Sequence, residues 1–296
     1  MPMGTEDLNP RTVDMDLLPT EDLLRLINQE DARVPQAVAE AIPSLSKLVE
    51  VTAEALRRGG RLIYVGAGTS GRIGVLDAAE WGPTFGMEGA VVAVMAGGYQ
   101  ALVKPVEGAE DDEEAAVRDM RSVSVSSKDV VLGLSASGRT PYVISAVRYS
   151  KGVGAFTACV TSNRDSPLST SVDLAVVVDV GPEVVAGSTR MKAGTAEKLV
   201  LNSLSTAVMV KLGRVYRNYM VELRPLNSKT RGRAVRIVSQ ICGVDQERAL
   251  KALSQVDFDV KAAIVSLKLG VSGEEARELL SKSGRDLRGV LGERGK

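Results

Sequence analysis

The chain has 296 residues, 44% of them hydrophobic and 25% charged, as in a globular protein with a sizeable buried core. Its 37 basic and 37 acidic residues give zero net charge, so the charge balance gives no support to a role on a nucleic acid or at a membrane surface. Histidine is absent, which excludes Ser-His-Asp and Cys-His mechanisms, so a general acid or base must be Glu, Asp, Lys, Tyr or Cys.

Nothing at the N-terminus resembles a targeting segment. MPMGTEDLNPRT has neither the basic nor the apolar part of a signal peptide, and no apolar run approaches the roughly 20 residues that span a bilayer. The two cysteines, Cys159 and Cys242, make neither a disulfide framework nor a Cys-x-x-Cys metal site. We therefore expect a cytoplasmic protein without a metal centre.

The first segment, residues 1–58, is predicted to be helical. Apolar residues recur at helical spacing in LPTEDLLRLINQED and again from 34 to 58. Thr20, followed by Glu21 and Asp22, suits the start of a helix.

From residue 61 the pattern changes to short, continuous apolar runs rich in β-branched residues. Strands of a parallel sheet that is covered on both faces have this pattern. Because helical stretches separate the runs, we expect right-handed crossovers and a three-layer αβα sandwich around a parallel five-stranded sheet. The predicted strands are 61–66, 90–96, 129–135, 155–161 and 173–180, and the predicted helices between them are about 71–80, 110–122 and 140–151.

After Gly187 the chain is predicted to be helical again. Residues 191–222 and 229–242 carry no strand pattern, and the rest reads as short amphipathic helices broken at CGVD, VDFD, GVSG and SGRD. We divide the chain into an N-terminal helical segment (1–58), a central sheet domain (59–225) and a C-terminal helical module (226–296).

Small polar residues follow three of the predicted strands: GAGTSGR (66–72), SASGRT (135–140) and TSNRDSP (161–167). Ligands of an open parallel sheet bind at the carboxyl ends of its strands. Glycine permits a close approach there, and hydroxyl groups and helix N-termini bind anions. The combination suits a phosphate and sugar hydroxyls, although each loop alone also reads as an ordinary helix-capping turn.

The first loop also matches G-x-G-x-x-G, the pattern of a dinucleotide site. That site needs an acidic residue at the end of the second strand, which here ends in AVMAGGYQ. A Walker A loop would need Gly-Lys followed by Ser or Thr, which is absent. The sequence therefore gives weak support to a nucleotide site.

The two motifs GxGTSxR and SxSGxT resemble those of sugar isomerase (SIS) domains, which bind phosphosugars. RLIYVGAGTSGRIGVLDAAE (61–80) resembles more specifically the N-acetylmuramic acid 6-phosphate etherases. The likeness continues through PTFG, AGG, VEGAEDD and ASGRTPYVISAV, and it resumes at VGPEVVAGSTRMKAGTAEKLVLN (180–202). With LINQED (26–31) and the helical tail it covers nearly the whole chain, and it implies a flavodoxin-like SIS sandwich.

The resemblance implies a carbon–oxygen lyase that cleaves the D-lactyl ether of N-acetylmuramic acid 6-phosphate within peptidoglycan recycling. The products would be N-acetylglucosamine 6-phosphate and D-lactate. A base removes the C2 proton of the open-chain sugar, a protonated acid assists the departure of lactate from C3, and water then adds. Two carboxyl groups in opposite protonation states can perform this cycle without a metal or an organic cofactor.

The family's acid corresponds to Glu80, and its second glutamate corresponds to Glu110. The neighbours Trp81, Pro83 and Phe85 would raise the pKa of Glu80 if they formed an apolar pocket around it. Without the resemblance, Glu80 reads as an exposed helix residue and Glu110 as part of an acidic first helical turn. Asp111 and Asp112 are adjacent candidates, and Glu107 is the most plausible substitute.

Hydroxyl and amide side chains of the loops are the candidate phosphate ligands. Ser188 and Lys192 would complete the pocket, unless Ser188 and Thr189 cap the following helix instead. Arg72 and Arg139 read equally well as surface residues. The candidate ligands in the strand-end loops are Thr69, Ser70, Ser135, Ser137, Thr140 and Asn163.

Two departures from the family pattern affect the expected pocket shape: EWGPTF stands where E-x-P-P-T-F is common, and AGGYQ carries a tyrosine. An aldose–ketose isomerase of the SIS class would use similar loops, but the long etherase-like segments argue against it. A non-catalytic phosphosugar regulator, like the glucokinase regulatory protein, is argued against by the presence of both Glu80 and Glu110. The resemblance further implies a homodimer in which each subunit helps to close the other's pocket.

Overall fold

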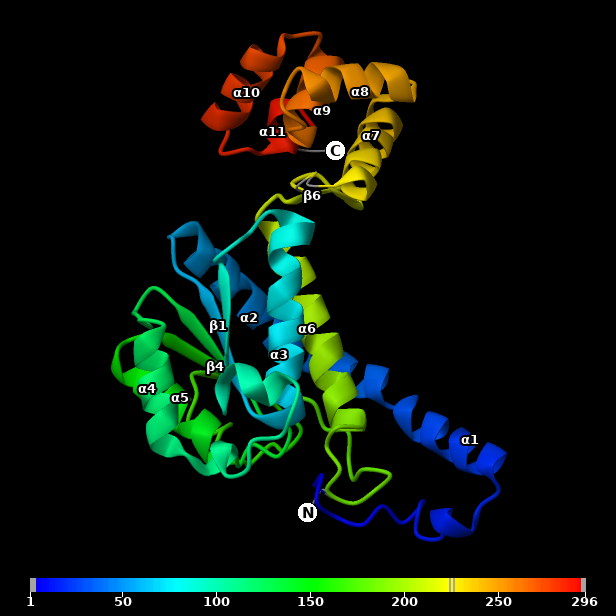
Figure 1. Cartoon of the computed structure of the whole chain (residues 1–296), viewed down its shortest axis with the longest axis vertical. Helices are drawn as coiled ribbons and strands as arrows, with labels where there is room; N and C mark the ends of the chain where they lie inside the picture. Colours follow the sequence, from blue (N-terminus) through cyan, green and yellow to red (C-terminus); the bar gives the residue numbers. More distant parts are fainter. Residues whose placement is uncertain (1–3, 224, 226, 294–296) are drawn as a thin grey trace. The chain divides into compact units, whose positions relative to one another are not determined.

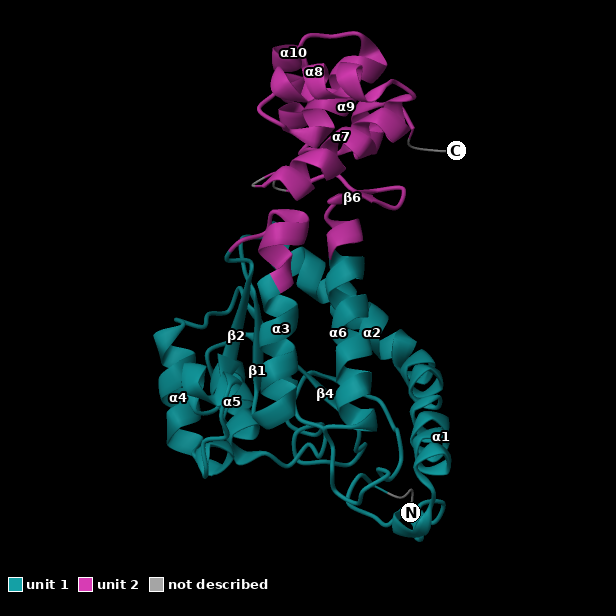
Figure 2. Cartoon of the chain, turned by 45° about the vertical axis from the view of Figure 1, so that its right-hand side comes forward, with its two compact units in different colours: residues 1–79, 89–208 teal, residues 80–88, 209–296 magenta. Residues whose placement is uncertain are grey.

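The computed structural model describes residues 4–223, 225 and 227–293, which divide into two compact units (Figure 2). Unit 1 holds residues up to 79 together with 89–208, and unit 2 holds 80–88 together with the residues from 209 onward. These boundaries differ from the three predicted segments. The N-terminal helices share a unit with the sheet, and a short piece of an early helix belongs with the C-terminal residues.

The core of unit 1 is a sheet of five parallel strands in the order β2-β1-β3-β4-β5. All five predicted strands are confirmed; four are one or two residues shorter than their apolar runs, and β5 covers half of the run 173–180. Strands β1 and β3 are buried along their whole length because both faces of the sheet are covered. The strands are β1 (Leu62–Gly66), β2 (Val91–Met95), β3 (Val130–Leu134), β4 (Phe156–Thr161) and β5 (Leu174–Val177).

Helices cover both faces of the sheet, as the predicted sandwich requires (Figure 1). Ile63 and Val65 of β1 face the α4 and α5 side, whereas Tyr64 faces the other side and donates to Asp77 Oδ2 at 2.8 Å. The helices that begin in unit 1 are α1 (Thr20–Asp31), α2 (Val34–Arg57), α3 (Gly68–Phe85), α4 (Glu113–Ser122), α5 (Pro141–Gly152) and α6 (Lys192–Lys211), with short 3-10 turns η1 (Met15–Leu17), η2 (Gly98–Leu102) and η3 (Ala109–Asp111).

The prediction that residues 191–222 contain no strand is wrong. Helix α6 ends at Lys211, and a small antiparallel hairpin of β6 (Val215–Tyr216) and β7 (Tyr219–Met220) follows. Gly213 and Arg217 both adopt positive φ, at 68° and 55°, which lets the chain leave the helix and reverse. Strands of two residues are too short to produce a recognisable alternation in the sequence.

The C-terminal helices are confirmed, and the four predicted breaks fall between them. Each break supplies a cap: the side chains of Asp245, Asp259, Ser272 and Asp286 each accept a backbone N–H of the following helix. The helices are α7 (Ser228–Cys242), α8 (Gln246–Ser254), α9 (Val260–Leu269), α10 (Gly273–Lys282) and α11 (Leu287–Val290).

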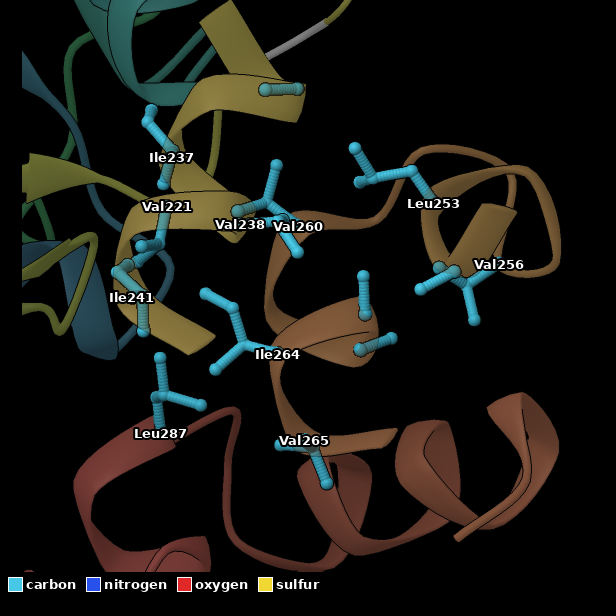
Figure 3. Packing of buried hydrophobic residues seen from close by; sticks show 14 of the residues in the cluster. Val221, Ile237, Val238, Ile241, Leu253, Val256, Val260, Ile264, Val265 and Leu287 are labelled. Atoms are coloured by element: carbon cyan, nitrogen blue, oxygen red, sulfur yellow. The ribbon is translucent and has the colours of Figure 1, made fainter. Parts of the chain in front are cut away.

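One apolar cluster holds unit 2 together (Figure 3). Helix α9 lies within it, since Ile264 and Val265 are fully buried against residues such as Ile241 and Leu287. The hairpin contributes Tyr216 to the same cluster. Among the described residues no helix has the length and apolar content that crossing a membrane requires.

Candidate functional site

The three loops that the sequence singled out lie at one edge of the sheet. Strands β1, β3 and β4 are consecutive neighbours and run parallel, so their carboxyl ends meet. The loop after β1 opens α3 and the loop after β3 opens α5. Helix N-termini therefore point at this edge, where their free N–H groups and positive dipole ends favour an anion.

The SASGRT loop is held in shape by its own hydroxyl groups. Ser135 Oγ lies 2.8 Å from Thr140 Oγ1 and accepts the backbone N–H of Gly138 at 3.1 Å. Ser137 Oγ accepts the N–H of Arg139 at 3.2 Å. Ser135 is buried, whereas Ser137 and Thr140 are partly exposed. A hydroxyl that accepts one hydrogen bond still has its own proton to donate, so Ser137 retains a donor for a phosphate oxygen.

Asn163, after β4, fastens this edge of the sheet to the N-terminal segment. Its amide nitrogen donates to the carbonyl oxygens of Ala136 and Ser137 at 3.1 and 3.3 Å and to Thr5 Oγ1 at 3.1 Å. These bonds occupy the amide, so Asn163 shapes the loop in the single chain. A cavity of about 400 Å³ adjoins it, lined by Gly4, Thr5, Glu6, Asp7, Ser137, Arg139, Ser162, Asn163, Arg164, Asp165, Ser166 and Asp179.

Thr69 and Ser70 lie in the first turn of α3 and are both partly buried. Ser70 Oγ lies 2.8 Å from Oε1 of Glu197 on α6, within hydrogen-bond distance. Glu197 did not emerge from the sequence, although it stands in the quoted segment AGTAEKLVLN, because its partner is 127 residues away. Arg72 donates to the carbonyl oxygens of Ala101 and Leu102, so it ties α3 to η2.

Lys192 does not fit the predicted role of a phosphate ligand. Its side chain is fully buried, and its ammonium group pairs with Glu30 Oε2 at 2.8 Å. Arg11 and Asn9 bind the same carboxylate. The hydrogen bond from Arg11 comes first, followed by those from Lys192 and Asn9, and together they lower the pKa of Glu30 to about 2 despite its burial. Lys192 thus stabilises the fold beside the loops.

The alternative prediction, that Ser188 and Thr189 cap α6, is not confirmed, because Glu183 caps this helix. The buried carboxylate of Glu183 accepts the backbone N–H groups of Lys192 and Ala193 at 3.0 and 2.9 Å. Burial raises the pKa of Glu183, against the effect of these bonds. Ser188 is partly buried, and its side chain stays a candidate for substrate.

Glu110 is exposed and lies in the 3-10 turn η3, not in α4. Asp112 caps α4 by accepting the N–H of Ala115 at 2.7 Å, which gives this candidate a structural role. Helix α5 contacts η3, and Ser145 Oγ donates to the carbonyl oxygen of Glu113 at 3.0 Å. The turn that carries Glu110 therefore lies beside α5, the helix that SASGRT opens.

Glu80 is exposed near the C-terminal end of α3. Trp81 is 1% exposed, Pro83 is exposed and Phe85 is partly buried. The expectation of an apolar pocket around Glu80 is therefore wrong for the single chain. Glu107 and Asp111 are exposed as well. Among the described residues no group of three or more Cys, Asp or Glu side chains is placed to hold a metal ion.

Comparison with known proteins supports the SIS fold and identifies the family of the chain. The family model described as "Glucokinase regulatory protein N-terminal SIS domain" matches residues 44–151, and the one described as "SIS domain" matches residues 102–207. N-acetylmuramic acid 6-phosphate etherases of Yersinia pestis (strain Pestoides F) and Yersinia pseudotuberculosis (serotype O:1b, strain IP 31758) are each 50% identical over 288 residues, covering 97% of this chain and 98% of theirs. The chain belongs to the N-acetylmuramic acid 6-phosphate etherase family.

Solved structures agree with the fold of this etherase-family chain. A phosphoheptose isomerase from Francisella tularensis superposes with a TM-score of 0.52 at 14% identity, covering 65% of this chain and 100% of that one. A phosphoheptose isomerase from Neisseria gonorrhoeae gives a TM-score of 0.51 at 18% identity, over 64% of this chain and 98% of that one. The expected SIS sandwich is confirmed.

Proposed function

We propose that the protein cleaves the D-lactyl ether of N-acetylmuramic acid 6-phosphate, releasing D-lactate and N-acetylglucosamine 6-phosphate. The observation that carries the proposal is 50% identity over 97% of the chain to proteins named for this activity. The geometry supports it, because hydroxyl groups and helix N-termini suited to a sugar phosphate line one edge of the sheet.

The proposed chemistry is elimination followed by addition of water. Glu110 acts as the base that removes the C2 proton of the open-chain sugar. Glu80 acts as the acid that protonates lactate as its bond to C3 breaks, and water then adds at C3. The exposure of both carboxyl groups in the single chain leaves them accessible to a substrate or to a second subunit.

The 6-phosphate is proposed to bind between the first turns of α3 and α5. Ser70, Ser137 and Thr140 would donate to its oxygens, with Thr69 and Ser188 beside them. Ser135 supports Thr140 through their shared hydrogen bond. Asn163 holds the loop by its bonds to the carbonyl oxygens of Ala136 and Ser137.

We further propose a homodimer with shared active sites. Ser70 and Glu80 are ten residues apart on α3, which is roughly 15 Å along an α-helix. Only three carbon–carbon bonds separate C6 and C3 of the sugar, so this spacing along the helix favours a site to which a second copy contributes. A second copy would supply the missing carboxyl group.

Exposed apolar side chains beside α3 support such a contact. Leu76, Tyr99 and Val103 are 50%, 85% and 78% exposed, and β2 is an edge strand of the sheet. An apolar surface of this kind favours association. We place the enzyme in the cytoplasm, in peptidoglycan recycling, where its phosphorylated substrate would be found.

The test is incubation with N-acetylmuramic acid 6-phosphate and an assay for D-lactate, followed by solvent deuterium exchange at C2. The wild type should release D-lactate. Both Glu80→Gln and Glu110→Gln should lose release, and exchange at C2 should survive better in Glu80→Gln because its base is intact. The reverse pattern would exchange the two roles, and full activity of either variant would remove that residue from the mechanism. A wild type that releases no D-lactate would overturn the proposed function.

A further inference from the structure

The carboxyl group of Glu197 is buried beside the proposed phosphate site and is only half satisfied. The residue is 2% exposed on α6, and its Oε1 lies 2.8 Å from Ser70 Oγ. Its other oxygen, Oε2, is also buried and has no hydrogen-bond partner among the described residues. A charged carboxylate is poorly stabilised in such a place, because a buried charge needs a partner for each of its oxygens.

In the part of the chain that the structure describes, no cationic side chain compensates the burial of Glu197. Burial is the larger influence and the hydrogen bond with Ser70 is the smaller, opposing one, so the pKa of Glu197 rises to about 8. Other titratable groups on the two helices have partners of their own. Asp77 on α3 accepts from Tyr64 and Ser205, Lys192 on α6 pairs with Glu30, and Lys198 on α6 donates to Asn202. Glu197 therefore carries a proton at neutral pH.

We propose that Glu197 is a positioning residue whose neutral carboxyl group donates its proton from Oε1 to Ser70 Oγ, so that the hydroxyl proton of Ser70 is directed at the phosphate of the substrate. In this arrangement Oε2 is an uncharged carbonyl oxygen, for which burial without a partner costs least. If the proton were on Oε2 instead, a buried O–H donor would be left without an acceptor.

Loss of the proton would reverse this hydrogen bond. An ionised Glu197 accepts only, so Ser70 has to donate its single proton to the carboxylate and has none for the phosphate. The carboxylate would also add a negative charge beside a phosphate dianion. Binding of the sugar phosphate should therefore weaken as the pH rises through the pKa of Glu197. The inference rests on the proposed function, because it assigns the phosphate of that substrate to Ser70.

The decisive experiment measures the Kd of N-acetylglucosamine 6-phosphate by calorimetry at pH 7 and pH 9. With a pKa of about 8, the neutral fraction of Glu197 falls from about nine-tenths to about one-tenth, so the Kd of the wild type should rise roughly tenfold. Glu197→Gln keeps an N–H donor for Ser70 and cannot ionise, so its Kd should stay nearly flat. Ser70→Ala should bind more weakly than the wild type at pH 7 and should show a smaller rise in Kd between the two pH values, because it has no hydroxyl donor to lose.

Asp77→Asn is the matched control. Asp77 lies on α3 and, like Glu197 on α6, carries a buried carboxyl group, but it accepts hydrogen bonds from Tyr64 and Ser205 and not from Ser70. It should keep the wild-type rise in Kd. N-acetylglucosamine without the phosphate should show no rise with any variant. In kinetics, the difference between the wild type and Glu197→Gln should fall on KM, since Glu197 acts through the phosphate and not at C2 or C3.

The proposal is overturned if the wild-type Kd is the same at both pH values, or if Glu197→Gln shows the same rise as the wild type. Either result is compatible with D-lactate release, so the proposed function would stand. A wild type that releases no D-lactate but shows the rise in Kd would instead overturn the reaction while the role of Glu197 in binding held.

Discussion

Two buried glutamates of unit 1 show how hydrogen-bond and ion-pair partners determine whether a carboxyl group is ionised. Glu30 and Glu197 are 3% and 2% exposed. Glu30 receives hydrogen bonds from Arg11, Lys192 and Asn9, and its pKa is lowered to about 2. Among the described residues Glu197 has Ser70 as its one hydrogen-bond partner, and its pKa is raised to about 8. Glu30 is thus a charged anchor for the start of α6, and Glu197 is a neutral acid further along the same helix.

Removal of the charge at Glu30 should destabilise the protein strongly. Glu30→Gln leaves the fully buried ammonium of Lys192 without its counter-charge, which costs about 3–5 kcal/mol in comparable buried pairs. Glu21→Gln is the control, because its pair with Arg25 is 76% and 67% exposed and such pairs contribute about 1 kcal/mol or less. Urea unfolding followed by circular dichroism measures both. Equal losses would mean that Lys192 finds another partner or water.

The same ion pair predicts the direction of acid unfolding. Because the folded-state pKa of Glu30 is below its ordinary value of 4.5, its contribution is fully present above pH 4.5 and is lost as the pH falls toward about 2. Unfolding midpoints between pH 5 and pH 2 should therefore fall less in Glu30→Gln than in the wild type. Parallel curves for the two proteins would contradict this assignment.

At the scale of elements, the sequence predicts what repeats locally and not what distant residues build. Continuous apolar runs predicted all five strands, and short cap-bearing breaks such as GVSG predicted the C-terminal helix boundaries, because both signals lie within a few residues. The two-residue strands β6 and β7 have no such signal. The pair of Lys192 with Glu30 joins positions 162 apart, so the lysine looked free for phosphate.

The candidate site follows the same division. The loops at the ends of β1, β3 and β4 were predicted from their small polar residues, and the structure brings them to one edge. Glu197 and Glu183 were missed because their contacts come from the fold. Glu80 was expected in an apolar pocket because Trp81 follows it, yet neighbouring helix positions face different directions, so one is exposed and the other buried.

The conformation of the SASGRT loop requires glycine at position 138. Its φ is +66°, and a Cβ there would lie 2.2 Å from Ser166 Oγ and 2.8 Å from Thr161 Oγ1. Gly181 is the matched control, since its φ is +65° and a Cβ there would meet nothing within 4 Å among the described residues. Both alanine variants incur the backbone strain, about 1 kcal/mol or more, but only Gly138→Ala adds a collision.

Gly138→Ala should therefore lower the urea midpoint more than Gly181→Ala does. It should also weaken binding of N-acetylglucosamine 6-phosphate, because the loop must shift. If the two variants were equally stable and bound equally well, the loop would accommodate a Cβ at position 138, contrary to this prediction.

At the scale of the whole molecule, the proposed shared site is open to a complementation test. Sedimentation of the full chain should give twice the 31.3 kDa monomer mass. Inactive Glu80→Gln and Glu110→Gln chains, unfolded and refolded together, should regain D-lactate release. If the two carboxyl groups of one site come from different subunits, one of the two sites in each mixed dimer is intact.

Each variant refolded alone is the control, and neither should recover. A mixed sample that stays inactive while forming dimers would put both glutamates of a site in one subunit. A fully active monomer would end the proposal of a shared site.

The discontinuity of unit 2 has a consequence for the order of events during synthesis. Arg214 Nη1 donates to the carbonyl oxygen of Phe85 at 3.2 Å, so unit 2 joins positions 129 apart in the chain. Residues 80–88 are synthesised before residues 89–208 of unit 1. They cannot contact the hairpin until residues 209–220 have also been synthesised. Closing so long a loop is entropically unfavourable unless the intervening residues, 89–208, are already compact. The sheet is thus expected to form first, and the C-terminal core is expected to be completed afterwards.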